Sequence, residues 1–120
     1  MQKSATFLLI TLLFTEIASA KIKTYTCLPV FLVISRNGYS EKENLTKDRA
    51  FKNMMLIEET KDTGVVITRG SISAQTSISG IYKVFYASNF KAKIDLDTKE
   101  YFEMVHMGLS TFTYFGKCTF

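Results

Sequence analysis

Hydrophobic and polar residues alternate along much of this chain, and the alternation predicts β-strands. It is clearest over residues 90–97, where apolar side chains share one face: Phe90, Ala92, Ile94 and Leu96. Residues 71–79 alternate in the same way, with serines and a glutamine on the polar face. A period of two is typical of strands that bury one face and expose the other.

Turn-forming residues recur along the chain and divide it into short segments. Asn37-Gly38, Ser79-Gly80 and Ser88-Asn89 are examples. Apolar or alternating runs lie between the turns, over residues 22–34, 52–60, 65–69, 71–79, 81–88, 89–96, 100–107 and 109–115. We therefore expect an all-β domain: an antiparallel meander of about seven to eight short strands, closed as a small barrel or folded as a sandwich.

Two segments depart from simple alternation. The run 28–34 is apolar on both faces and contains Pro29, which lacks an N–H donor, so we expect Pro29 at a bulge or on a sheet edge. The segment 45–58 suits either a helix capped by Thr46 or a buried strand over 54–57. We expect a loop or a single helical turn near residues 44–50, followed by a strand.

The first twenty residues have the order of a secretory signal peptide. Lys3 precedes the apolar run 7–14, and Ala18-Ser19-Ala20 forms a small-residue cleavage site. The apolar run is too short to span a bilayer, and no lipidation motif precedes a cysteine. We expect cleavage before Lys21, a single domain over residues 21–120, periplasmic or secreted localisation, and no stable membrane insertion after the signal is removed.

The chain contains two cysteines, Cys27 and Cys118. An even count in an oxidising compartment predicts one disulfide, which would join the first and last strands. Closing so long a loop contributes roughly 4–5 kcal/mol in the chain-entropy model. The alternative is two free, reactive thiols, although no neighbouring group is suited to lower a thiol pKa.

The formal net charge is +4, with basic residues scattered and interrupted by acids. Nucleic-acid binders cluster their basic residues into a stripe, so this distribution argues against a nucleic-acid partner. It predicts either an ordinary solvated surface or weak attraction to anionic glycans, envelope lipids or an acidic protein.

Candidate catalytic and metal-binding groups are sparse. His106 is the single histidine, and Glu103, three residues away, falls on the opposite face of a strand, so no local acid–base pair forms. Asp95 and Asp97 share a face but lack the glycine and distal glutamate of a calcium loop. We therefore expect no enzyme activity, metal or cofactor. Asn44-Leu45-Thr46 fits the N-glycosylation pattern, which has meaning only in a eukaryotic source.

Aromatic residues are concentrated in the C-terminal half of the chain. They predict either large side chains filling a small barrel or an exposed aromatic surface. Four tyrosines are the candidates for such a surface: Tyr82, Tyr86, Tyr101 and Tyr114.

Together these features favour a non-enzymatic binding or inhibitor-like domain whose partner is an extracytoplasmic protein or glycan. The alternatives are a small-ligand carrier with a lipocalin-like cavity and a hydrolase that uses His106 as a base. In outline, the chain resembles the small periplasmic inhibitors of C-type lysozyme, through Tyr25-Thr26-Cys27 and Ser79-Gly80 followed by Tyr82. It departs from that family's spacing around Tyr82 and contains no tryptophan, so no site residue is carried over.

Overall fold

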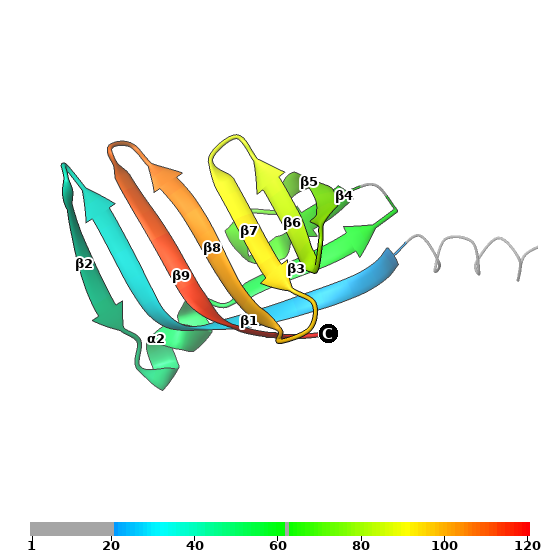
Figure 1. Cartoon of the computed structure of the whole chain (residues 1–120), viewed down its shortest axis with the longest axis horizontal. Helices are drawn as coiled ribbons and strands as arrows, with labels where there is room; N and C mark the ends of the chain where they lie inside the picture. Colours follow the sequence, from blue (N-terminus) through cyan, green and yellow to red (C-terminus); the bar gives the residue numbers. More distant parts are fainter. Residues whose placement is uncertain (1–20, 62) are drawn as a thin grey trace, which may run out of the picture.

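The computed structural model of the chain describes residues 21–61 and 63–120 (Figure 1). The predicted signal peptide, residues 1–20, lies outside the described residues. The described part is nearly all antiparallel β-structure closed as a barrel, which confirms the predicted class and selects the barrel over the sandwich. None of the helices in the described part is long and apolar enough to cross a lipid bilayer.

The elements follow the chain as a meander of hairpins. In order they are β1 (Lys21–Arg36), β2 (Tyr39–Asn44), α2 (Lys47–Lys52), β3 (Met55–Thr60), β4 (Thr63–Val66), the 3-10 turn η1 (Ile67–Arg69), β5 (Ile72–Ser79), β6 (Tyr82–Ala87), β7 (Phe90–Asp95), β8 (Glu100–Met107) and β9 (Ser110–Thr119).

The long strand β1 closes the barrel because it pairs with two different strands along one edge. Its first part, up to Cys27, pairs with β3, and its second part, from Phe31 to Arg36, pairs with β2. On the other edge, β1 pairs with β9 from Thr26 to Arg36. Eight strands therefore close the barrel, and β2 extends the sheet beyond it.

Strand β2 was absent from the sequence prediction. All but one of its residues are exposed, so Tyr39–Asn44 shows no alternation of apolar and polar positions. The segment forms a strand because the Asn37-Gly38 turn folds it back onto β1. Both turn residues have positive φ, 47° and 83°, as a two-residue hairpin turn requires.

Pro29 lies at a β-bulge, as predicted. The register of β1 against β9 shifts between Pro29 and Phe31, so Val30 is the extra residue. Gly116 is the partner of Pro29, and a Cβ on Gly116 would collide with the Leu28 carbonyl oxygen. The bulge thus turns Phe31 outward, opposite Phe115.

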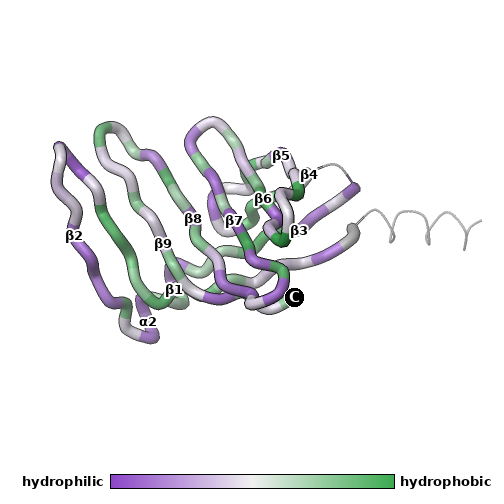
Figure 2. Tube along the Cα trace, in the orientation of Figure 1, coloured by the Kyte–Doolittle hydropathy of each residue, from purple (hydrophilic) through white to green (hydrophobic). Residues whose placement is uncertain are grey.

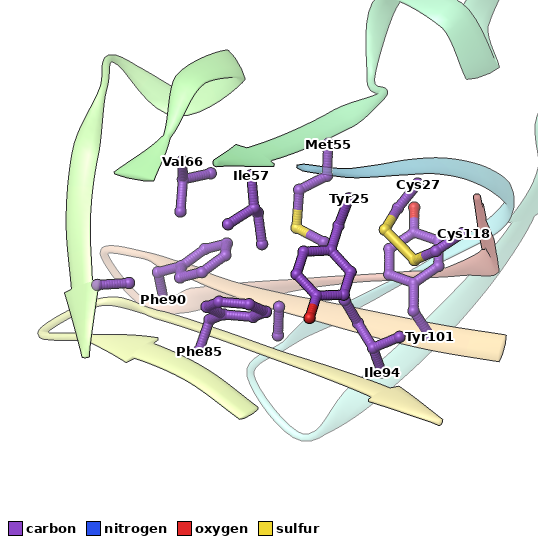
Figure 3. Packing of buried hydrophobic residues seen from close by; sticks show 12 residues of the cluster. Tyr25, Cys27, Met55, Ile57, Val66, Phe85, Phe90, Ile94, Tyr101 and Cys118 are labelled. Carbon is purple, nitrogen blue, oxygen red and sulfur yellow. A yellow bond between two sulfur atoms is a disulfide. The ribbon is translucent and has the colours of Figure 1, made fainter. Parts of the chain in front are cut away.

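The predicted disulfide is present, and it pins the first strand to the last. Cys27 and Cys118 are direct partners in the β1–β9 register, with their Cα atoms 3.9 Å apart. Both cysteines are buried in the core shown in Figure 3. Tyr25 and Phe85 meet there edge to face at 5.4 Å, and Gly64 leaves room for the Phe85 ring.

A short helix followed by a strand forms in the segment 45–58, for which the sequence suited either structure. Thr46 caps the helix, and its Oγ1 accepts a hydrogen bond from the Arg49 N–H at 3.3 Å. The six-residue helix α2 runs from Lys47 to Lys52, two residues beyond the predicted turn, and β3 begins at Met55.

Candidate functional site

His106 lies exposed near the end of β8. Its Nδ1 is 3.1 Å from the Thr111 Oγ1 on the neighbouring strand. Glu103 faces the opposite way, as the alternation predicted, and it is fully buried in the barrel. Among the described residues, no cluster of three or more His, Cys, Asp or Glu is suited to a metal ion.

The four candidate tyrosines lie on two different faces. Tyr82 and Tyr86 alternate with the buried Phe85 and therefore point outward from β6. Tyr101 is buried in the barrel, and burial raises the pKa of its hydroxyl. Tyr114 also points inward, where its hydroxyl donates to the Asn53 Oδ1 at 3.2 Å. These tyrosines therefore do not form one surface.

A row of outward-facing residues crosses the sheet in a single register. Each member is the direct partner of the next along the strands β5, β6, β7, β8, β9, β1 and β2: Ser77, Val84, Lys93, Phe102, Phe115, Phe31 and Asn44. With a strand spacing of about 4.8 Å, the row is about 29 Å long when followed along the curved sheet. We call this row and its neighbours on the same side of the barrel the outer face.

One end of the outer face is an aromatic stack of Phe31, Phe115 and Phe102. The Phe31 and Phe115 rings are stacked at 4.8 Å with an interplanar angle of 15°, and Phe102 tilts against Phe115 at 6.3 Å. The Lys42 ammonium lies 4.4 Å from the centroid of the Phe31 ring. The three rings are only half-buried, and they are not part of the buried core inside the barrel.

The other end of the outer face is a hollow of about 460 Å³ lined by hydroxyl groups and lysines. The described lining residues are Ser77, Ser79, Val84, Tyr86, Lys91 and Lys93. None of these lining residues is an acid. We call this feature the hydroxyl–lysine hollow.

A second hollow, of about 290 Å³, joins the two ends. Lys93 and Tyr82 line it, with the Lys93 ammonium 4.2 Å from the centroid of the Tyr82 ring. Two acids, Asp95 and Glu100, also line it. Asp95 is held in the turn after β7, where its carboxylate accepts hydrogen bonds from the backbone N–H groups of Asp97 and Thr98 at 2.8 and 2.9 Å. The hydrogen bond from the Thr98 backbone is the main reason that the pKa of Asp95 is lowered.

Two buried ion pairs lie inside the barrel, where sequence analysis did not anticipate them. Arg69 binds Glu103 through two hydrogen bonds, and Lys83 contacts Glu59 at 2.5 Å. Both glutamates occupy positions on the apolar face of an alternating strand. A carboxylate at such a position was the sequence signal from which a buried ion pair could have been predicted. Because a buried charge needs a partner, these pairs serve the fold rather than the outer face.

Comparison with protein-family models, with curated proteins and with solved structures found no match to this chain. The residues that carry the outline resemblance to the lysozyme inhibitors lie in two places. Tyr25 and Cys27 belong to the core, whereas Ser79 and Tyr82 pair across the β5–β6 turn and border the outer face.

Proposed function

We propose that this domain is a non-catalytic binding module that docks an extracytoplasmic protein through its outer face. The observation that carries the proposal is the aromatic stack, in which three phenylalanines are partly exposed on the outside of a barrel with a complete core. Contiguous apolar side chains of this kind, rimmed by polar residues, mark interaction surfaces.

The geometry of the stack favours a protein partner over a glycan. Stacking of a sugar requires an open ring face, but Phe31 and Phe115 are stacked on one another and the Lys42 ammonium lies over the Phe31 ring. Together the three rings form an apolar ridge on the outside of the barrel. Such a ridge suits insertion between the side chains of another protein, where aromatic anchors dominate binding energy.

The polar end of the outer face supports a partner with acidic groups. Serine hydroxyls and the ammonium groups of Lys91 and Lys93 line the same hollow. Hydrogen bonds to carboxylates from charged donors are among the strongest available to a surface. We therefore expect acidic side chains beside the apolar centre of the partner's interface.

The alternative expectation, a small-ligand carrier, has less support. The barrel interior is occupied by Phe85, Met55, Ile57 and other fully buried side chains (Figure 3). A carrier needs an enclosed apolar cavity of several hundred cubic ångströms along this axis.

The test is capture of partners from the envelope fraction of the producing cell, using Phe102→Ala and a matched control. Phe51, on α2, is 54% exposed and lies outside the outer face, so Phe51→Ala removes an equivalent ring elsewhere. We expect Phe102→Ala to weaken binding of a captured protein by about tenfold or more while Phe51→Ala has little effect. Equal loss in both variants would contradict the proposal, and urea unfolding of each variant checks that the domain remains folded.

A further inference from the structure

Three hairpin tips project from the same end of the molecule: β1–β2, β6–β7 and β8–β9 (Figure 1). Two of them carry large apolar side chains that are exposed to solvent. Tyr39 is 58% exposed, Met107 is 63% exposed and Leu109 is 86% exposed. The β8–β9 tip is accordingly coloured as hydrophobic in Figure 2.

These two tips are neighbours in one sheet. Arg36 pairs with Tyr39 on one side and with Ser110 on the other, and Ser110 pairs with Met107. The Arg36 Nε donates to the Ser110 Oγ at 2.9 Å, which ties the tips together. A guanidinium therefore lies between an exposed tyrosine and an exposed methionine.

The β8–β9 turn holds Leu109 outward. Gly108 and Leu109 are the two residues between the paired Met107 and Ser110, and Gly108 has a φ of 61°. A two-residue hairpin turn is too tight for its second side chain to fold back onto the sheet, and such turns usually carry polar residues. Exposure of Leu109 is thus built into the backbone.

The two ends of the barrel differ in charge. Residues 36–39 and 106–110, which form the apolar tips, include Arg36 and no acid. The opposite end has the β7–β8 turn, where residues 95–100 include Asp95, Asp97 and Glu100 against a single Lys99. The β5–β6 turn at that end also exposes apolar side chains, Ile78 and Ile81, but beside these acids. Charge complementarity with an anionic surface therefore exists at the end that carries the apolar tips and not at the end that carries the β7–β8 turn.

We propose that the β1–β2 and β8–β9 tips form a peripheral membrane-docking site for an anionic lipid surface. Leu109 and Met107 enter the boundary between headgroups and acyl chains, to a depth of about 5–10 Å. Tyr39 takes the interfacial position that tyrosine favours, and Arg36 binds lipid phosphate. Three apolar side chains and one guanidinium give reversible binding that strengthens with the anionic lipid content. This inference does not depend on the proposed protein-binding role of the outer face.

The natural absence of tryptophan allows a direct test. In the full chain, expressed with its own N-terminal segment and purified after export, Leu109→Trp introduces a single indole at the tip. We expect its fluorescence to shift to shorter wavelength with phosphatidylglycerol-containing vesicles, and brominated lipids to quench it. Pure phosphatidylcholine vesicles should produce a much smaller change.

Ile78→Trp is the matched control, since Ile78 is 68% exposed at the opposite end. The fluorescence of its indole should not change when vesicles are added. A second variant, Met107→Ser with Leu109→Ser in the native chain, should lower vesicle co-sedimentation by about tenfold or more. Co-sedimentation also covers the case in which Leu109→Trp alters the turn. The inference is overturned if native protein does not sediment with anionic vesicles, or if the Ile78→Trp protein responds as strongly as the Leu109→Trp protein.

Discussion

Arg69 and Glu103 form a two-pronged ion pair inside the barrel, with Nε–Oε2 and Nη2–Oε1 distances of 2.8 and 2.7 Å. Glu103 is fully buried, and burial raises the pKa of its carboxyl while Arg69 acts in the opposite direction. The guanidinium also donates to the backbone carbonyls of Asn53 and Met54. One side chain on η1 therefore joins β8 to the segment between α2 and β3.

We predict that Arg69→Met lowers the free energy of unfolding by about 3–5 kcal/mol at neutral pH, because it leaves a buried carboxylate without its cation. The deficit should narrow in acid, where Glu103 is protonated and less costly to bury. Urea unfolding at several pH values measures both effects. Arg49→Met is the control: it breaks the exposed Arg49–Glu43 pair and should cost less than about 1 kcal/mol. A cost for Arg69→Met as small as that of the control would contradict the prediction.

The raised pKa of Tyr25 predicts that the domain loses stability at alkaline pH. Burial, reinforced by Glu59, raises this pKa from 10.0 to about 12. The folded state therefore favours the neutral phenol. The contribution of Tyr25 to the free energy of unfolding is complete below pH 10 and is lost as the pH rises from 10 to 12. The difference corresponds to about 2–3 kcal/mol. Unfolding free energies of the wild type and Tyr25→Phe, measured from pH 9 to 12, should show a shallower decline in the variant; parallel curves would refute this.

The disulfide should account for a large part of the stability. We expect the double variant Cys27→Ala and Cys118→Ala to lose about 2–5 kcal/mol, since the crosslink restrains nearly the whole domain in the unfolded state. Urea midpoints of this variant and of the oxidised wild type measure the loss. Peptide mapping of exported protein without reductant should recover the Cys27–Cys118 pair, and free thiols in that sample would count against it.

Gly116 should not tolerate a methyl group. Its hypothetical Cβ falls against the Leu28 carbonyl and 2.7 Å from the Pro29 Cα, both of which belong to the backbone of β1. Because the bulge and the proline ring leave this backbone little freedom to move, we expect Gly116→Ala to cost about 1–3 kcal/mol. Thr113→Ala, on the same strand, should cost less than about 1 kcal/mol. Thermal unfolding of the two variants would disprove the prediction if their midpoints agreed.

Local patterns identified most of the strands. The alternation over residues 71–79 and 90–97 corresponds to β5 and β7, and the Thr46 cap lies where the helix begins. The same local patterns did not identify β2, whose two faces are both exposed to solvent. They also ended the last strand before Thr119, where β9 ends in the structure. A strand whose residues are nearly all exposed leaves no hydrophobic signature.

The four candidate tyrosines show what a local sequence pattern cannot determine, which is the side of the barrel that each side chain faces. Tyr101 and Tyr82 are equally aromatic in the sequence, but the register of β8 turns Tyr101 into the core while that of β6 turns Tyr82 outward. The outer-face phenylalanines were not singled out. Phe31 reaches Phe115 only because the Val30 bulge reverses the side on which β1 presents its residues.

The sequence by itself determined the β class, the meander of hairpins and the pairing of its two cysteines, because these follow from periodicity, turn chemistry and count. The signal peptide over residues 1–20 remains a prediction of the same kind. Tertiary structure alone decided that β1 is shared between β2 and β3, that the barrel closes through β9, and that one register row crosses seven strands. Those outcomes depend on pairing between strands distant in the chain, and such register is set by packing, bulges and closure rather than by any local run of residues.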